Sequence, residues 1–567
     1  MTKTLLLFLL TTMLCFGEKW SHKATGDVKW MRVSEAGTLY YGTDDGIFAV
    51  DPATGNTTWK RDEFKKIPES DVEELPGTPL LFIASNNGTF AKSGWVVAID
   101  LLTGATVWET EKVKGSVVGM IPVYSKDMIL MLTVPQPTLH AKITVNALGI
   151  FDGKLAWQTE MDEKADMFPA EKSSKFFPKF DISAHAKPTI DGDSVYLAYA
   201  GVHKLDLNTG KLLWKSPYDV TEKAFKQANA SPLVAGPLVY TSAKGVVRAF
   251  DKETGAAKWT SADFGSGVPE LAYANDILFA RMGGTFYEMY KREYQLKKPL
   301  GVIALNPASG QVKWKYDKAK DSLTNMALLE KEKIVLVADT KNLIGLAMDG
   351  SESFLTPLEF KVKSSGLGKA AKIGFGALRG GAIGLTKAAM QGGPTDPPLV
   401  VVHQGDGKLV VRATQHILQF DAATRSVAWA TELEAPGNSM LTKIAMGAAF
   451  AMMYAAETGH AMNTQLGTSE NSGANKNRRQ MIDGWESVVS KRFSKTNTKG
   501  NFTYMLTDIK LEGEKGPGIA GVNMTTGLVE RKIIFGDKEP EYTVDEVGGV
   551  IYKKHKKGNE IQAIDIQ

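Results

Sequence analysis

The stretch Ala249–Trp259 reads AFDKETGAAKW and is one of the clearest copies of a pattern that recurs along the chain. Alternating apolar residues lead to an Asp, Thr-Gly follows after two residues, and a Trp follows after three more. The alternation predicts a β-strand. Asp and Thr side chains bond nearby backbone N–H groups in tight turns, and Gly adopts a backbone conformation that other residues avoid. The pattern therefore predicts a strand, a turn and a second strand ending in a large apolar ring.

Copies of this pattern occur on both sides of Ala249–Trp259. Three others agree with it closely: Ala49–Trp59, Ala98–Trp108 and Lys204–Trp214. Two copies vary, because Ala304–Trp314 has Asn and Ser for Asp and Thr, and Phe151–Trp157 is shortened. In Gln419–Trp429, Arg425 stands where Gly is expected. Two degenerate copies, near Asp349 and Gly527, lack the Trp.

Each copy is preceded by a second hairpin with its own turn, such as Gly42–Gly46 and Ser242–Gly245. A unit of four antiparallel strands, with 29 to 57 residues between successive Trp residues where the copies are unbroken, is typical of a β-propeller blade. We expect a large aromatic ring to fill the gap to the neighbouring blade. The residues assigned to this role are Trp30, Trp59, Trp108, Trp157, Trp214, Trp259, Trp314 and Trp429.

The two ends of the chain hold complementary halves of one repeat. Ile561–Gln567 stops at the strand that precedes Thr-Gly, and Thr25–Trp30, TGDVKW, reads as the missing half. Joined, they predict an all-β, single closed propeller of four-stranded blades over residues 18–567, closed by both termini. Ten copies of the motif can be counted. Because familiar rings have about 4–8 blades, we expect about eight blades and at most ten.

The first 17 residues have the features of a secretory signal peptide. Lys3 precedes the apolar run Leu5–Leu14, and small residues precede Glu18. The run is too short to span a membrane. We therefore predict that residues 1–17 are removed and that the protein is exported, to the periplasm or beyond the cell. Lipidation of Cys15 is the less favoured alternative, because Leu14 stands where a small residue is typical of lipoproteins.

Composition excludes several classes of protein. The net charge of +4 is too small for a polybasic nucleic-acid binder, so no nucleic-acid partner is expected. The single Cys excludes a disulfide framework, a Cys-rich zinc module and a haem-attachment motif.

These repeats resemble the pyrroloquinoline-quinone (PQQ)-type propeller repeat. That family includes quinoprotein alcohol dehydrogenases and non-catalytic periplasmic propellers, among them a lipoprotein of the outer-membrane β-barrel assembly machine. The resemblance therefore implies a propeller fold, and it allows either an enzyme that uses PQQ and Ca²⁺ or a binding scaffold. It does not choose between them, because one fold serves many functions.

The residues favour the scaffold. The adjacent cysteines common in quinoprotein dehydrogenases are lacking, and Ca²⁺ needs six to eight converging oxygens. The acids that can be placed are expected to form outer turns: Asp51, Asp100, Asp206, Asp251 and Asp421. No catalytic, cofactor-binding or metal-binding residue is assigned. We predict a non-enzymatic exported scaffold that binds a protein or a cell-envelope component. The alternatives are a PQQ- and calcium-dependent dehydrogenase and a subunit of an outer-membrane assembly complex.

Two insertions interrupt the late repeats: a Gly-rich one at 361–398 and an Ala/Met-rich one at 440–493. Both carry small residues at four-residue spacing, which on helices form stripes that permit close approach. The first stripe is Gly376, Gly380, Gly384 and Ala388, and the second is Gly447, Ala451 and Ala455. We predict two helices that pack on each other. The alternatives are contact of 361–398 with a membrane surface or a partner, because lysines flank its apolar segment, and a mobile Gly-rich loop.

Overall fold

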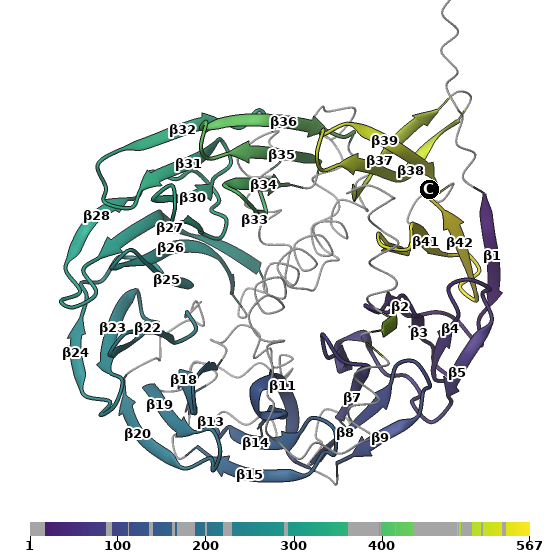
Figure 1. Cartoon of the computed structure of the whole chain (residues 1–567), viewed down its shortest axis with the longest axis horizontal. Helices are drawn as coiled ribbons and strands as arrows, with labels where there is room; N and C mark the ends of the chain where they lie inside the picture. Colours follow the sequence, from purple (N-terminus) through teal and green to yellow (C-terminus); the bar gives the residue numbers. More distant parts are fainter. Residues whose placement is uncertain are drawn as a thin grey trace, which may run out of the picture.

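The chain forms a closed ring of β-sheets (Figure 1). This computed structural model describes residues 17–86, 93–110, 113–134, 140–161, 165–166, 188–198, 201–218, 230–288, 293–360, 396, 398–413, 415–434, 485, 487–488, 502–511, 514–535 and 540–566. Most of the predicted signal peptide and most of both predicted insertions lie outside these residues. Within them, no helix is long and apolar enough to cross a membrane.

The described residues contain ten blades, which we number in chain order. Blade 1 comprises β2 (Trp30–Val33), β3 (Leu39–Gly42), β4 (Ile47–Val50) and β5 (Thr57–Arg61). Blade 2 comprises β6 (Val72–Glu74), β7 (Leu80–Asn86), β8 (Ser93–Asp100), β9 (Thr106–Glu109) and β10 (Val113–Lys114). Blade 3 comprises β11 (Ser116–Val123), β12 (Met128–Val134), β14 (Thr144–Gly149) and β15 (Leu155–Glu160). Blade 4 comprises β17 (Thr189–Asp191), β18 (Ser194–Ala198), β19 (Gly201–Asp206) and β20 (Leu212–Pro217).

The next four blades repeat the same antiparallel order. Blade 5 comprises β21 (Leu233–Ala235), β22 (Leu238–Ala243), β23 (Val246–Asp251) and β24 (Ala257–Thr260). Blade 6 comprises β25 (Glu270–Ala274), β26 (Ile277–Glu288), β27 (Glu293–Leu305) and β28 (Val312–Tyr316). Blade 7 comprises β29 (Ala327–Leu329), β30 (Ile334–Ala338), β31 (Asn342–Ala347) and β32 (Ser353–Pro357). Blade 8 comprises β33 (Val400–Gly405), β34 (Lys408–Arg412), β35 (His416–Asp421) and β36 (Ser426–Glu432).

The last two blades close the ring. Blade 9 has three described strands: β37 (Phe502–Leu511), β38 (Glu514–Asn523) and β39 (Val529–Ile534). Blade 10 comprises β40 (Tyr542–Asp545), β41 (Val550–Lys554), β42 (Glu560–Asp565) and β1 (Glu18–Lys23). The smaller elements are η1 (Glu69–Asp71), η2 (Tyr124–Lys126), β13 (His140–Ala141) and β16 (Ala165–Asp166). All ten motif copies are thus blades, at the upper end of the predicted range.

Closure by both termini is confirmed, but with a different N-terminal strand. Residues of β1 pair with β42, with Trp20 opposite Ala563. Trp20 therefore occupies the motif position that Thr25–Trp30 was predicted to supply. Trp30 lies instead in β2, the first strand of blade 1, opposite Gly42. The prediction was wrong because Thr25-Gly26 was interpreted as the motif turn, whereas these residues connect blade 10 to blade 1.

A shared contact joins seven consecutive pairs of blades, from the 10–1 joint to the 6–7 joint. The indole ring of one blade covers the Gly of the next blade's motif turn, where an added Cβ would lie 2.3–2.7 Å from the ring. Its Nε1 donates a hydrogen bond of 2.7–3.1 Å to a backbone carbonyl in that turn. We call this arrangement the Trp lock. Its members are Trp20–Gly55, Trp59–Gly104, Trp108–Gly153, Trp157–Gly210, Trp214–Gly255, Trp259–Gly310 and Trp314–Gly350.

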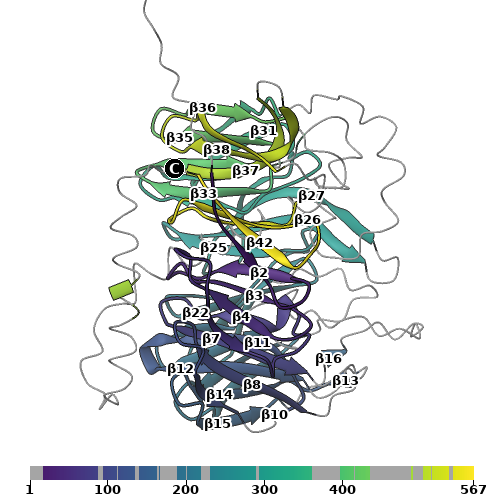
Figure 2. The same cartoon turned by 90° about the vertical axis from the view of Figure 1, so that its right-hand side faces the viewer.

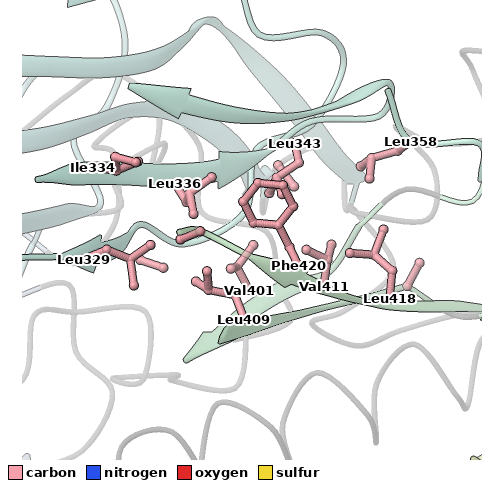
Figure 3. Close-up of a cluster of buried hydrophobic side chains, with 14 of the residues drawn as sticks. Leu329, Ile334, Leu336, Leu343, Leu358, Val401, Leu409, Val411, Leu418 and Phe420 are labelled. Carbon is pink, nitrogen blue, oxygen red and sulfur yellow. The ribbon is translucent and has the colours of Figure 1, made fainter. Parts of the chain in front are cut away.

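Apolar side chains fill the space between neighbouring blades. Figure 3 shows the cluster between blades 7 and 8, where Leu336 and Leu343 face Val411 and Phe420. These four side chains are fully buried, and burial of such groups drives packing of sheet on sheet. The core is therefore divided into layers between blades rather than gathered at one centre.

Candidate functional site

The acids predicted to form outer turns do so. Oδ1 of Asp251 accepts the N–H of Glu253 at 3.1 Å and that of Thr254 at 2.9 Å. These hydrogen bonds and Lys258 lower the pKa of Asp251, because they stabilise its charged form. Equivalent turn bonds are made by Asp51, Asp100, Asp206 and Asp421. Within the described ranges, no group of three or more His, Cys, Asp or Glu side chains is arranged to hold a metal ion.

Both small-residue stripes lie outside the described residues: Gly376, Gly380, Gly384 and Ala388 in the first, and Gly447, Ala451 and Ala455 in the second. Their pairing stays a prediction. The structure does describe the residues at which the insertions join the ring. The first joins between blades 7 and 8, and the second joins between blades 8 and 9.

The ends of the first insertion are fastened together by a buried His–Asp pair. The Asp396 N–H donates to the Phe360 carbonyl at 3.0 Å. Oδ2 of Asp396 accepts from the backbone of Gln415 and from His416, whose Nδ1 lies 2.9 Å away. The Phe360 ring stacks on the His416 ring at a centroid distance of 4.7 Å. The insertion therefore leaves and rejoins the ring at neighbouring residues.

The second insertion joins the ring at two different faces. β36 begins after the turn at Arg425 and ends at Glu432, and the carbonyl of Glu434, two residues further on, accepts the Asp508 N–H. Phe502, where the chain resumes, pairs with Asn523 at the opposite end of β37, beside the motif turn. Between them, Trp485 is 1% exposed and joins the apolar cluster of blades 1 and 2. The short yellow-green segment that includes Trp485 lies on the side of the ring away from the β26–β27 hairpin (Figure 2).

Charged side chains from both neighbours meet the inner edge of β37, where the other blades have their first strand. From blade 8, the Arg412 guanidinium donates to Thr503 Oγ1 at 3.2 Å and to the Tyr504 carbonyl at 3.3 Å. From blade 10, the Glu546 carboxylate accepts the Tyr504 N–H. Part of the Glu546 side chain is exposed to solvent. The protein packed around its carboxylate removes water from it and raises its pKa to about 7. Burial has the opposite effect on a cation and lowers the pKa of Arg412.

A second cluster of charged and polar side chains lies between blades 1 and 2. The Glu74 carboxylate accepts the Glu35 N–H at 3.0 Å. Burial is the main cause that raises the pKa of Glu74 to about 7, and the Glu35 charge adds to it. Arg32 and the Tyr40 hydroxyl face Glu74 and favour its charged form.

These two glutamates predict a pH-dependent stability. Because their pKa values are higher in the folded chain than the ordinary value near 4.5, the folded state holds protons that the unfolded state has lost. Stability should therefore fall as the pH rises from about 4.5 to about 7. We expect the fall in thermal midpoint over this range to be smaller in the Glu74→Gln, Glu546→Gln double variant. Equal falls in both proteins would contradict the assignment.

The β26–β27 hairpin is the element that projects most clearly from the ring (Figure 2). Its strands have 12 and 13 residues. β25 pairs only with residues 277–281 of β26, and β28 pairs only with residues 302–305 of β27. Residues 284–288 and 293–297 therefore pair only with each other in the part of the chain that the structure describes. A two-stranded hairpin alone is marginally stable in water, so this extension has two sheet edges available to another strand.

Sequence reasoning missed the hairpin and the charged groups around β37. The hairpin had a signal, because Ile277 to Leu305 is unusually long for two blade strands and their turn. Arg412 and Glu546 had none, since each follows a strand pattern like those of other blades. Their role arises from their neighbours in space.

Comparison with known proteins agrees with the repeat assignment. Residues 141–335 match the family model described as outer membrane protein assembly factor BamB. No curated protein matches the chain. Among solved structures, BamB from Moraxella catarrhalis is 15% identical and has a TM-score of 0.36, with 72% of this chain and 97% of that chain covered.

A quinohemoprotein alcohol dehydrogenase from Pseudomonas putida is 14% identical with a TM-score of 0.32, covering 71% of this chain and 72% of that chain. The match over residues 141–335 and the blade architecture confirm the predicted resemblance. The chain is a closed β-propeller whose repeats resemble the PQQ-type repeat, with a family match over residues 141–335.

Proposed function

We propose that the protein is an exported, non-catalytic scaffold that binds a protein partner in the cell envelope. The observation that carries this proposal is the β26–β27 hairpin, whose outer half projects from the ring with two unflanked edges in the described chain. Extended segments of partner proteins add to such edges through backbone hydrogen bonds. The family model matched by residues 141–335 is named for an assembly factor of outer-membrane proteins, which supports the same class of role.

The turn acids support the non-catalytic part of the proposal. A calcium site at the ring centre needs several converging oxygens, whereas the Asp51, Asp206 and Asp251 carboxylates are engaged in their own turns at the outer edge. We therefore expect PQQ and Ca²⁺ to separate from the purified protein on gel filtration. Co-elution of quinone absorbance, together with dye reduction by an alcohol, would instead support the dehydrogenase.

Shortening the hairpin tests the binding surface. In the test variant, residues 284–297 are replaced by Asn-Gly, which closes a two-residue turn. After crosslinking in intact cells, we expect the partner that is attached to the parent protein to be lost from this variant. Circular dichroism should be unchanged, because the removed residues pair only with each other. The matched control replaces Lys244-Gly245, in the tight turn of blade 5, with Asn-Gly and should keep the partner. Equal capture by all three proteins would place the binding surface elsewhere.

A further inference from the structure

Three consecutive joints of the ring lack the complete Trp lock among the described residues. These are the 7–8, 8–9 and 9–10 joints. The first insertion joins the ring at the 7–8 joint and the second at the 8–9 joint. The other seven joints all have the indole over the Gly and the indole hydrogen bond. The three departures differ from one another in chemistry.

At the 7–8 joint both halves of the lock are replaced. Phe354 stands at the Trp position and Arg425 at the Gly position, with a positive φ of 53°. The Arg425 guanidinium lies 5.0 Å from the Phe354 ring centroid and forms an ion pair with Glu352. Such an exposed pair contributes about 0–1 kcal/mol, and Phe has no N–H to donate. The indole hydrogen bond of the regular joints therefore has no equivalent here.

At the 8–9 joint an indole ring still covers the turn Gly, but the indole hydrogen bond is lost. Trp429 covers Gly527, where an added Cβ would lie 2.6 Å from the indole. However, its Nε1 is buried and has no acceptor in the described part of the chain. The equivalent carbonyl, that of Met524, accepts from the Gln419 amide at 3.4 Å. A buried donor without a partner costs roughly 1–3 kcal/mol.

At the 9–10 joint neither half is present in the residues that the structure describes. Arg531 pairs with Gly521 as Trp59 pairs with Ala49 in blade 1, so it stands at the Trp position. Its guanidinium lies 3.9 Å from the Phe502 ring of its own blade. No motif turn joins β42 to β1 in blade 10, because these strands come from opposite ends of the chain. Blades 9 and 10 are instead joined by apolar packing, by Glu546, and by Lys553 of β41, whose ammonium donates to the Phe535 carbonyl directly after β39.

We propose that blades 8 and 9 form a sector that detaches locally from its neighbours while the remaining eight blades stay locked. Local opening starts where stabilising contacts are weakest. The 7–8 and 9–10 joints, which lack the complete Trp lock in the described residues, flank this sector on its two sides, and the 8–9 joint lies within it. Opening would expose the inner edge of β37 and the point at which the second insertion joins the ring. This motion goes beyond the proposed function and does not depend on it.

Substitutions that restore or remove the Trp lock test this proposal. The measurement is amide hydrogen exchange of the full-length protein. In the parent, we expect amides of β34, β35, β37 and β38 to exchange at least about tenfold faster than equivalent amides of β12 and β14. The variant Phe354→Trp, Arg425→Gly should slow exchange in β34 and β35, because the introduced indole could donate to the Ala422 carbonyl. The reverse variant, Trp108→Phe, Gly153→Arg, should speed exchange in β12 and β14.

Two results would overturn the proposal. One is uniform exchange around the ring of the parent protein. The other is unchanged exchange in β34 and β35 when the lock is restored at the 7–8 joint. Both results can be obtained without the reverse variant, so the test stands even if that variant fails to fold.

Discussion

Substitution of Gly104 by Ala should destabilise the ring by roughly 2–5 kcal/mol, the sum of two costs. Gly104 has a φ of +72°, where an L-residue costs about 1–2 kcal/mol. An added Cβ would also lie 2.6 Å from the Trp59 ring, and overpacking of this kind costs about 1–3 kcal/mol. The Trp59 indole cannot move away freely, because its Nε1 donates a hydrogen bond to the Leu101 carbonyl at 2.8 Å. The measurement is the free energy of local opening at β5 and β9, from amide exchange.

Gly77 is a matched control for this substitution. Its φ of +71° is almost the same, but an added Cβ would meet nothing within 4 Å. Gly77→Ala should therefore cost only the backbone strain of about 1–2 kcal/mol. The difference between the two variants isolates the contact with Trp59. If both variants lose the same stability, the steric part of the Trp lock is negligible.

The repeat pattern was sufficient to predict the fold because each blade is specified locally. Turn residues such as Asp251 and Gly255 act within a few positions of each other, and the Trp that follows meets the same partner in every regular blade. Even the degenerate copies are blades, because strand alternation survives in them. The predicted range of about eight to ten blades includes the observed ten, and it was centred on eight because familiar rings are smaller.

The candidate site was less predictable because its residues come together only through the closed ring. Arg412 and Glu546 are far apart in the sequence and meet at Tyr504 of a third blade. Similarly, Trp485 follows the eighth blade in the chain but packs between the first two. The Arg at position 425 was visible as an exception to the motif, yet its pairing with Phe354 required the neighbouring blade. Local patterns do not contain such contacts.

Removal of the Arg412 guanidinium should have the second large effect. Arg412→Leu keeps the apolar stem but leaves the Tyr504 carbonyl without this donor and Glu546 without its nearby cation. Loss of one member of a buried charged group typically costs about 3–5 kcal/mol, and because Glu546 is open to solvent we expect roughly 2–4 kcal/mol here. The pKa of Glu546 should rise further, since Arg412 is the charge that lowers it.

A double variant separates charge from packing at this joint. In Arg412→Leu, Glu546→Gln, the neutral amide no longer needs a cation, so we expect part of the lost stability to return at pH 8 and little of it at pH 5. The measurement is the opening free energy of β37 by amide exchange at both pH values. Simple additivity of the two substitutions at pH 8 would show that Arg412 acts through its bonds to Thr503 and Tyr504 alone. A pH-dependent coupling would show that charges from blades 8 and 10 hold β37 in place together.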